Sequence, residues 1–153
     1  MLLSMLFAAH AAEIGTDVKL GVGAQTGDIF LAANAKYWLG TRFGVSASLG
    51  SSVWIQHLRV NAELDFMELS RWENAELDLS GVLGIDAGLG TRYALAAQVG
   101  AGVGAGVAMR FKKTPAELYF DVGVGGYPVC YAAYGSWCYV MPRGDLGFRW
   151  YVL

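Results

Sequence analysis

The stretch from Leu95 to Val107 reads LAAQVGAGVGAGV, and from Ala97 onwards it alternates between two kinds of residue. Ala and Val occupy every second position, while Gln98 and four glycines occupy the positions between them. Successive side chains of a strand point to opposite faces, so this period of two predicts a β-strand with one apolar and one small, polar face. The uncharged run from Tyr93 to Met109 is also long enough to suggest a transmembrane helix. A helix gives no reason for glycine at every second position, and the strand is therefore our prediction.

The same alternation recurs along the chain, separated by short turn-like segments such as Thr26 to Asp28 and Lys112 to Pro115. No segment has a convincing helical period. The pattern predicts eight strands, over residues 14–25, 29–39, 43–55, 58–66, 77–89, 95–107, 118–124 and 146–152. A long Tyr-rich loop is expected between the last two, at about residues 125–144.

Composition limits the class of protein. The chain has 153 residues, of which 55% are hydrophobic and 16% charged, with a net charge of −2. Typical soluble domains carry about 25% charged residues, so this chain is short of charge. The high apolar content excludes a disordered chain, and the weakly acidic balance offers nothing to attract nucleic acid. A single all-β domain remains, either a soluble barrel or a membrane barrel.

The size of the polar residues decides which face lies inside. An eight-stranded barrel has an interior only just wide enough for side chains, and here the polar face is also the small face. We therefore predict an antiparallel, up-and-down transmembrane β-barrel with its polar face inside and its apolar face towards lipid. The predicted polar network of the lumen consists of Asp17, Lys19, Lys36, Arg59, Glu63, Asp65, Glu76, Asp78, Asp86, Glu117, Asp121 and Arg149.

Charges inside a narrow barrel must be paired, because an unpaired buried charge is very costly. The first and last strands must be neighbours for the barrel to close, so we expect Arg149 to pair with an acid such as Asp17 or Asp121. A polar lumen could conduct ions or protons. Because eight strands leave no open channel, we instead expect a lumen sealed by salt bridges.

Aromatic residues gather near the predicted strand ends, as they do in the two aromatic girdles of membrane barrels. One rim is expected to hold Tyr37, Phe43, Phe66, Trp72, Phe111, Phe120 and Trp150, and the other Trp54, Tyr93 and Tyr127.

The N-terminal run MLLSMLFAAHAA, residues 1–12, is apolar and ends in small residues. It predicts a secretory signal peptide, followed by one barrel domain over residues 13–153. Cys130 and Cys138 are the only cysteines. Two cysteines are too few for a structural zinc site, and in an exported protein a closely spaced pair suggests a disulfide.

The segment MRFKKTPAELYFDVGVGGYP, a strand, tight turn and strand, and the terminal GDLGFRWYVL resemble small bacterial outer-membrane barrels of the OmpX and OmpA transmembrane-domain type. Members of that group end in a glycine-containing strand with alternating aromatics that the barrel-assembly machinery recognises. Gly147, Phe148, Trp150 and Val152 match this pattern, although the chain ends in Leu153 and not in Phe. The resemblance implies an outer-membrane location, the lipid bilayer and the assembly machinery as partners, and no particular activity.

The sequence contains no phosphate, dinucleotide or zinc motif, and we expect a non-enzymatic envelope protein without a cofactor. Its predicted loop carries aromatics that could bind an extracellular partner: Tyr127, Tyr131, Tyr134, Trp137 and Tyr139. Two alternatives stay open. One is a lipid-modifying enzyme using His57 near Ser51 and Ser52, although no acid is obviously placed to orient a histidine expected at the headgroup rim. The other is a secreted, lipocalin-like barrel that binds an apolar ligand and has its large apolar face inside.

Overall fold

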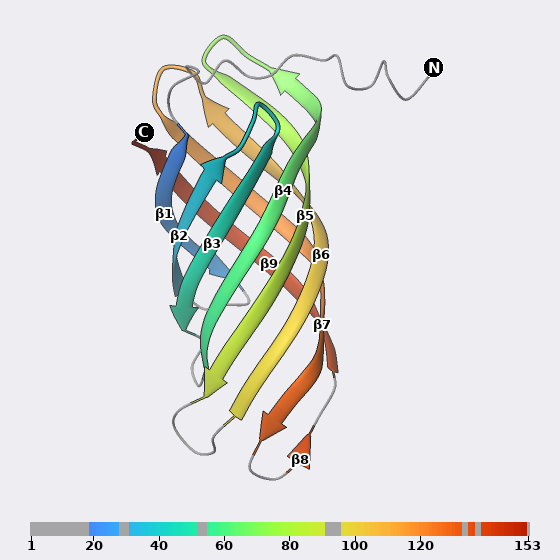
Figure 1. Cartoon of the computed structure of the whole chain (residues 1–153). Coiled ribbons are helices and arrows are strands. Elements are labelled where there is room, and N and C mark those ends of the chain that lie inside the picture. Colours follow the sequence, from blue (N-terminus) through green and yellow to red (C-terminus); the bar gives the residue numbers. More distant parts are fainter. Residues whose placement is uncertain are drawn as a thin grey trace, which may run out of the picture.

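A computed structural model describes residues 19–27, 31–51, 55–90, 96–132, 135–136 and 139–152. The described chain consists of antiparallel strands joined by turns (Figure 1). None of the described residues belong to a helix long and apolar enough to cross a membrane. The strands are β1 (Leu20–Gly27), β2 (Leu31–Trp38), β3 (Phe43–Ser51), β4 (Ile55–Arg71), β5 (Ala75–Gly90), β6 (Ala96–Phe111), β7 (Ala116–Ala132), β8 (Gly135–Ser136) and β9 (Tyr139–Tyr151).

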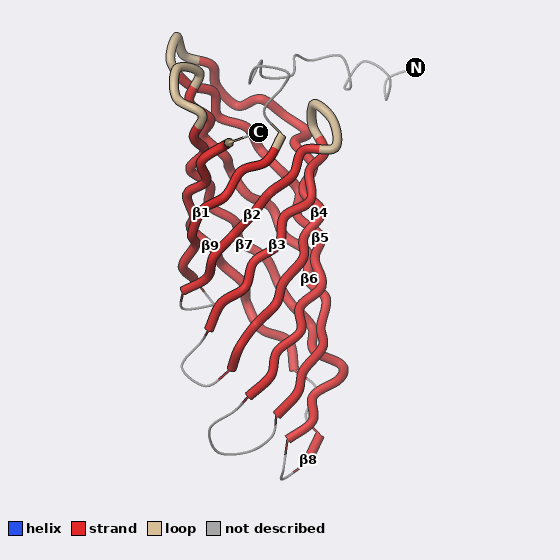
Figure 2. Tube along the Cα trace, turned by 60° about the vertical axis from the view of Figure 1, so that its left-hand side comes forward, coloured by secondary structure: helices blue, strands red, loops and turns tan. Residues whose placement is uncertain are grey.

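Eight of these strands close into a barrel with up-and-down order, which confirms the predicted strand number and topology. Each strand from β1 to β7 pairs with the next, and β9 pairs with both β7 and β1. The two-residue β8 pairs with the end of β7 and lies at the lower tip of the molecule, beyond the eight strands that close the barrel (Figure 2). β1 begins and β9 ends at the same end of the barrel, which is the upper end in Figure 1. This closure leaves no open edge along the paired parts of the wall.

The interior of the barrel is polar and its exterior apolar. In β2, for example, Ala32, Asn34, Lys36 and Trp38 are buried, and Leu31 is exposed. Among the described residues no Leu, Ile, Val, Met or Phe is buried, and the buried apolar residues are alanines and aromatics. The period-two faces predicted from the sequence are therefore confirmed, with the polar face inside.

The prediction of a long loop over residues 125–144 is wrong, because strands occupy most of this segment. β7 continues to Ala132 and β9 begins at Tyr139, with pairing that runs through Gly123↔Arg143 to Tyr127↔Tyr139. Glycine and proline in a sequence usually indicate a turn. In this segment they obscure the two-residue alternation of a strand, which in fact continues through them. Here they lie in strands whose pairing partners hold them extended.

The wall is taller on one side than on the other. β1 to β3 are 8 or 9 residues long, whereas β4 to β7 are 16 or 17. The upper part of β4 contains register shifts between Asp65 and Met67 and between Glu68 and Ser70. Such bulges reset the alternation of side chains, which explains why the sequence pattern predicts the end of this strand at Phe66 instead of Arg71.

Candidate functional site

The upper half of the lumen holds a cluster of buried ions centred on Arg149 and Glu117. These two residues face each other across β9 and β7, and Nη1 of Arg149 donates to Glu117 at 2.6 Å. Arg149 also donates to both carboxylate oxygens of Glu63, at 3.0 and 3.2 Å. Lys36 reaches Glu63 at 2.7 Å and Glu117 at 3.6 Å. All four side chains are at most 5% exposed, so each charge depends on its partners.

A second guanidinium extends this cluster towards the upper end. Arg110 pairs with Asp78 at 3.0 Å, with Glu117 at 3.2 Å, and also with Asp65. Trp38 covers these cations, because its ring lies 3.9 Å from Nζ of Lys36 and 4.5 Å from the guanidinium carbon of Arg110. We call the seven charged residues the upper ion cluster: Lys36, Glu63, Asp65, Asp78, Arg110, Glu117 and Arg149.

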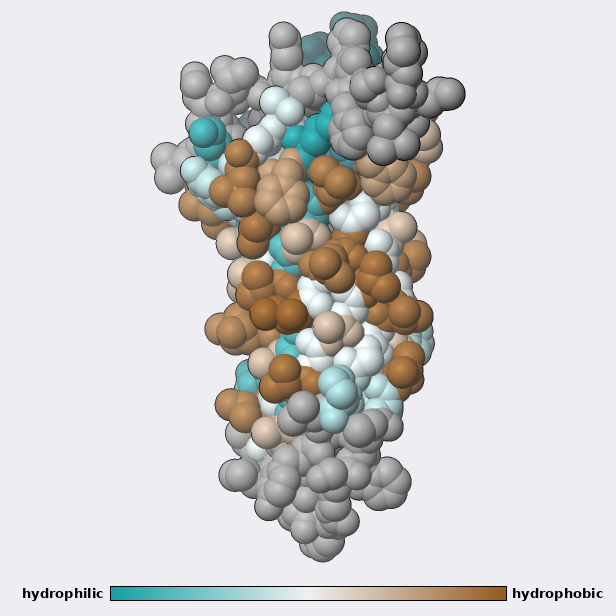
Figure 3. Space-filling view, turned by 45° about the vertical axis from the view of Figure 1, so that its right-hand side comes forward, coloured by the Kyte–Doolittle hydropathy of each residue, from teal (hydrophilic) through white to brown (hydrophobic). Residues whose placement is uncertain are grey.

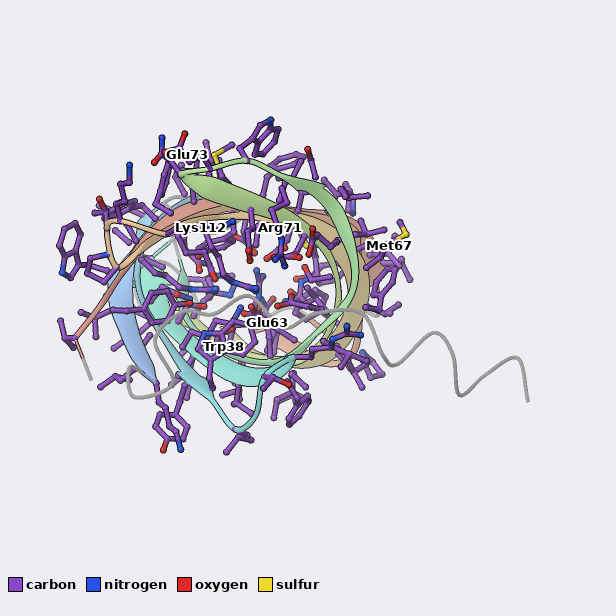
Figure 4. The ribbon with its side chains drawn as sticks, turned by 90° about the horizontal axis from the view of Figure 1, so that it is seen from above. Trp38, Glu63, Met67, Arg71, Glu73 and Lys112 are labelled. Atoms are coloured by element: carbon purple, nitrogen blue, oxygen red, sulfur yellow. The ribbon has the colours of Figure 1, made fainter. Side chains whose placement is uncertain are left out.

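The indole of Trp38 is fixed in this position by a chain of hydrogen bonds. Its Nε1 donates to the Tyr151 hydroxyl at 3.1 Å, and that hydroxyl donates to Glu117 at 2.9 Å. Figure 4 shows Trp38 and Glu63 inside the barrel, while Met67 points away from it. An aromatic side chain thus packs against two cations of the upper ion cluster.

Neutral side chains connect the upper ion cluster to the lower half of the lumen. Asn34 accepts a hydrogen bond from Arg149 and donates to Gln25 at 2.9 Å. Gln25 also accepts from the Tyr119 hydroxyl at 2.7 Å and donates to Asp145 at 3.2 Å. The guanidinium of Arg149 lies 3.8 Å from the centre of the Tyr119 ring, which adds a cation–π contact.

The lower ion cluster contains Asp145, Arg59, Asp86 and His57. Arg59 donates to Asp145 at 2.7 Å and to Asp86 at 3.0 Å. Nδ1 of His57 lies 3.2 Å from Asp86. One continuous network of contacts therefore runs from Asp78 near the upper end to His57 near the lower end.

Two tyrosines stack on each other near the lower end of the lumen. Tyr127 is only 2% exposed and stacks on Tyr139, with ring centres 4.9 Å apart. The Tyr139 hydroxyl donates to Gln98 at 2.6 Å. The prediction of an exposed binding aromatic is therefore wrong for Tyr127, whereas Tyr139 is 37% exposed although its hydroxyl is hydrogen-bonded to Gln98. Tyr131 lies in β7 by its backbone, whereas Tyr134 and Trp137 lie outside the described residues.

A separate group of salt bridges connects neighbouring strand ends and a turn at the upper rim. Glu76, 3% exposed, lies 3.2 Å from Arg71 and 3.3 Å from Lys112. Arg71 also binds Glu68 on its own strand, and that hydrogen bond raises the pKa of the exposed guanidinium above its ordinary value. Figure 4 shows Arg71 and Lys112 on the same side of the upper mouth of the barrel. Glu76 thus belongs to the rim, where it links β4, β5 and the turn after β6.

Nine of the twelve residues predicted for the lumen are buried: Lys36, Arg59, Glu63, Asp65, Glu76, Asp78, Asp86, Glu117 and Arg149. Asp121 is half-buried on the inner side of β7, beside Gly106. The prediction is wrong for Lys19, which is exposed just before β1, and Asp17 lies outside the described residues. The expected pairing of Arg149 with an acid is confirmed, but its partners are Glu117 and Glu63 and not Asp121, because register places Glu117 opposite Arg149.

Sequence reasoning missed two charged members of the network, Arg110 and Asp145. Both continue the predicted inward face by period two, since Arg110 follows the glycines of β6 and Asp145 precedes Gly147 and Arg149. The alternation therefore included both residues. The predicted strands were too short, because one ended at residue 107, before Arg110, and the other began at residue 146, after Asp145. His57 was also misplaced, because it is buried in the lumen and Asp86 orients it.

The lumen thus holds a buried salt-bridge network, in which the guanidinium groups of Arg149, Arg59 and Arg110 stay charged, because arginine does not release its proton in proteins. In the part of the chain that the structure describes, no group of three or more His, Cys, Asp or Glu could hold a metal ion. Ser51 binds Gln56 on the exposed side of the wall, away from His57, and Ser52 lies outside the described residues.

The Cys130–Cys138 disulfide remains a prediction, because Cys138 lies outside the described residues. Comparison with known proteins finds no matching family model, no matching curated protein and no matching solved structure.

Proposed function

We propose that the protein is a non-enzymatic β-barrel of the bacterial outer membrane, with a lumen closed to ions and protons. The observation that carries this proposal is the inverted distribution of polarity. Arg59, Arg149 and Glu117 are at most 1% exposed, whereas Leu83, Ile85 and Leu89 are more than 60% exposed. In water this surface would be a large uncovered apolar patch, but in a bilayer it is the expected lipid-facing band.

The apolar surface has the shape of a band. Hydrophobic side chains cover most of the middle of the barrel on the face seen in Figure 3. The exposed charged residues of the described chain lie at the upper rim, and they include Lys113 and Glu73 in two neighbouring turns. A barrel also satisfies its backbone hydrogen bonds within the wall, as a bilayer interior demands.

Aromatic side chains border this band at its upper side. All seven residues predicted for that rim are 37 to 49% exposed: Tyr37, Phe43, Phe66, Trp72, Phe111, Phe120 and Trp150. The predicted lower girdle is wrong for Tyr127, which lies inside, and Trp54 and Tyr93 lie outside the described residues. A belt of this kind supports one membrane–water interface at the upper end.

Three features of the sequence support the bacterial outer membrane in particular. Residues 1–12 resemble a signal peptide, Cys130 and Cys138 suit an oxidising compartment, and the last strand resembles the assembly signal of small outer-membrane barrels. In the structure Phe148 and Trp150 are each 44% exposed on the outside of β9, and Val152, directly after this strand, is 52% exposed. They are therefore accessible to an assembly partner and then to lipid.

The enzyme alternative gains one observation, which is the contact between His57 and Asp86. His57 is only 8% exposed inside the lumen, however, and that position is separated from lipid by the barrel wall. A His57→Ala variant that loses a lipid-modifying activity of the wild type would favour the enzyme. The soluble-barrel alternative requires large apolar side chains inside, and the described lumen holds ions instead.

Replacement of a lipid-facing residue tests the membrane proposal. Ile85→Arg places a charge on the apolar band, where lipid would make it unfavourable by about 2 to 4 kcal/mol near the midplane. We expect this variant to fold poorly into phospholipid vesicles, and Glu73→Arg, at an exposed turn, to fold like the wild type. Normal folding of Ile85→Arg would contradict a lipid-facing position.

Location is tested by fractionation of cells that express the full chain. We expect recovery with the outer membrane and a shift in gel mobility on boiling, because intact barrels resist detergent until heated. Recovery in the soluble periplasm without detergent would contradict the proposal. Sequencing of the N-terminus of the same material checks for cleavage after Ala12.

A further inference from the structure

The apolar band of the barrel is tall on the side of β5 and β6. The outward-facing residues of these strands are apolar from Leu77 to Leu89 and from Val99 to Phe111. A strand rises about 3.3 Å per residue and is tilted by about 40° in membrane barrels, so each residue adds about 2.5 Å of height. Each of these faces is therefore about 30 Å tall, which is enough to cross a whole hydrocarbon core.

The outer face of the opposite side is much shorter. On β3 it is apolar from Phe43 to Leu49, which corresponds to about 15 Å. On β2 the outward-facing residues from Leu31 to Leu39 cover about 20 Å. Figure 1 shows β3 ending well above the lower ends of β6 and β7. Strand order places β2 opposite β6, so the apolar band has the shape of a wedge.

Polar groups border the short face at both ends. Below it, Gln56 is exposed on the outside of β4, and its Nε2 donates to Oγ of Ser51 at 3.0 Å. Above it, the turn between β2 and β3 contains the exposed Thr41 and the half-buried Arg42. An amide or a guanidinium is unfavourable in hydrocarbon, where water cannot satisfy its hydrogen bonds. The hydrocarbon layer along β3 is therefore limited to the apolar residues between these two borders.

We propose that the bilayer is locally thinned along β1, β2 and β3, where the barrel contacts a hydrocarbon layer of about 15 to 20 Å. This inference rests on the membrane location proposed above. A face shorter than the bilayer is matched by thinner lipid, while the tall face keeps the lipid beside it at ordinary thickness. Tilting of the barrel can align one border of the band with water. It cannot make the two faces equally tall, because strand length fixes each height.

Spin labels at the two borders of the short face test the proposal. Thr41→Cys and Gln56→Cys place one label above and one below the apolar part of β3. The parent chain carries Cys130→Ser and Cys138→Ser and must keep the wild-type gel mobility before boiling. In vesicles of dioleoylphosphatidylcholine, we expect a water-soluble nickel complex to relax both labels more strongly than oxygen does. In a bilayer of uniform thickness, tilting brings one border to water and the other into lipid. A label at either border that responds mainly to oxygen would overturn the proposal.

The controls lie on the outer wall away from these borders. Val99→Cys and Ala105→Cys stand about 15 Å apart in height on the tall face of β6, and both should respond mainly to oxygen. Ala33→Cys, in the middle of the short face, should also respond to oxygen and show no spin–spin broadening. Broadening would mean that a second copy covers this face in place of lipid, and the proposal would fail. A chain that does not enter vesicles at all contradicts the membrane location and this inference with it, which separates the two failures.

A second test keeps the native cysteines. Ser51→Leu combined with Gln56→Leu makes the lower border apolar, so that thicker lipid can cover it. Relative to the wild type, we expect this double variant to raise the urea midpoint more in dioleoyl vesicles than in the thinner dilauroyl vesicles. The matched control is Asn74→Leu combined with Thr114→Leu, at exposed turn positions above the tall face, and it should show no such difference. An equal effect of Ser51→Leu and Gln56→Leu in both lipids would contradict a short face that thins the bilayer.

Discussion

Glu117 and Arg149 face each other directly across β7 and β9, with Nη1 of Arg149 2.6 Å from the Glu117 carboxylate. Both side chains are at most 1% exposed, and they lie where the strand that completes the barrel meets β7. The pair thus joins the closing strand to the rest of the wall. Glu117 also contacts Lys36 and Arg110, so its carboxylate connects three cations.

Removal of Glu117 should therefore be strongly destabilising. Glu117→Ala leaves three buried cations with fewer acids, and breaking a buried pair in this way costs about 3 to 5 kcal/mol. The measurement is the free energy of unfolding in urea from detergent or vesicles. Glu73→Ala is the control, because its side chain is 87% exposed and its contact with Lys113 is 3.9 Å long. Equal stability of the two variants would mean that the upper ion cluster contributes nothing to the fold.

A second prediction concerns the glycine that makes room for Tyr119. A Cβ at Gly147 would lie 2.3 Å from the Tyr119 hydroxyl oxygen, and that hydroxyl is bonded to Gln25. Gly147→Ala must displace the ring and should cost about 1 to 3 kcal/mol, as overpacking does. At Gly126 a Cβ would meet nothing within 4 Å, so Gly126→Ala is the matched control. The same unfolding experiment compares them, and a neutral Gly147→Ala would contradict this packing.

A third prediction concerns conduction. The wild type, reconstituted into planar lipid bilayers, should carry no steady ion current, because an eight-stranded barrel is filled by its side chains and here the two ion clusters fill it. Tyr127→Ala removes a buried aromatic side chain from the lower end but leaves both ion clusters, and it should also remain silent. Steady single-channel currents through the heat-modifiable wild type would show that the lumen is open.

The ion clusters themselves are tested by a charge-balanced variant. Replacement of Lys36, Glu63, Glu117 and Arg149 by serine, combined with Tyr127→Ala, removes two cations, two anions and the buried ring of Tyr127. If this variant folds, as judged by its gel mobility before boiling, we expect measurable current. A folded variant that stays silent would mean that Trp38 and the remaining charges are enough to seal the barrel.

The cysteine pair provides a fourth prediction. β7 and β9 are still paired at Tyr127↔Tyr139, close to both cysteines in sequence, so the chain reverses between them. We expect a Cys130–Cys138 disulfide in protein isolated from the envelope, and peptide mapping without reductant should recover the linked peptide. In the chain-entropy model a loop this short adds about 2 to 3 kcal/mol of stability. Two free thiols in freshly isolated protein would refute the disulfide.

The sequence alone determined the strands, their number and the face that each turns inwards. These follow from the period of two, which is a local property of the extended backbone and is visible in LAAQVGAGVGAGV as in the other strands. The small size of the polar residues then determined that they lie inside. Local patterns failed where the backbone departs from regular alternation, at the bulges of β4, or where glycine and proline resemble a turn, in β7 and β9.

Only the tertiary structure decided which charges meet. Arg149 finds Glu117 at a separation of 32 residues and Glu63 at a separation of 86, and both contacts depend on the register between strands and on closure of the barrel. Glu63 lies on the far side of the lumen from β9 in strand order, so no local pattern relates the two. Because the interior is narrow, the side chain of Arg149 on β9 can reach Glu63 on the opposite side of the barrel. The two residues are brought this close only when all eight strands have paired and the barrel is closed.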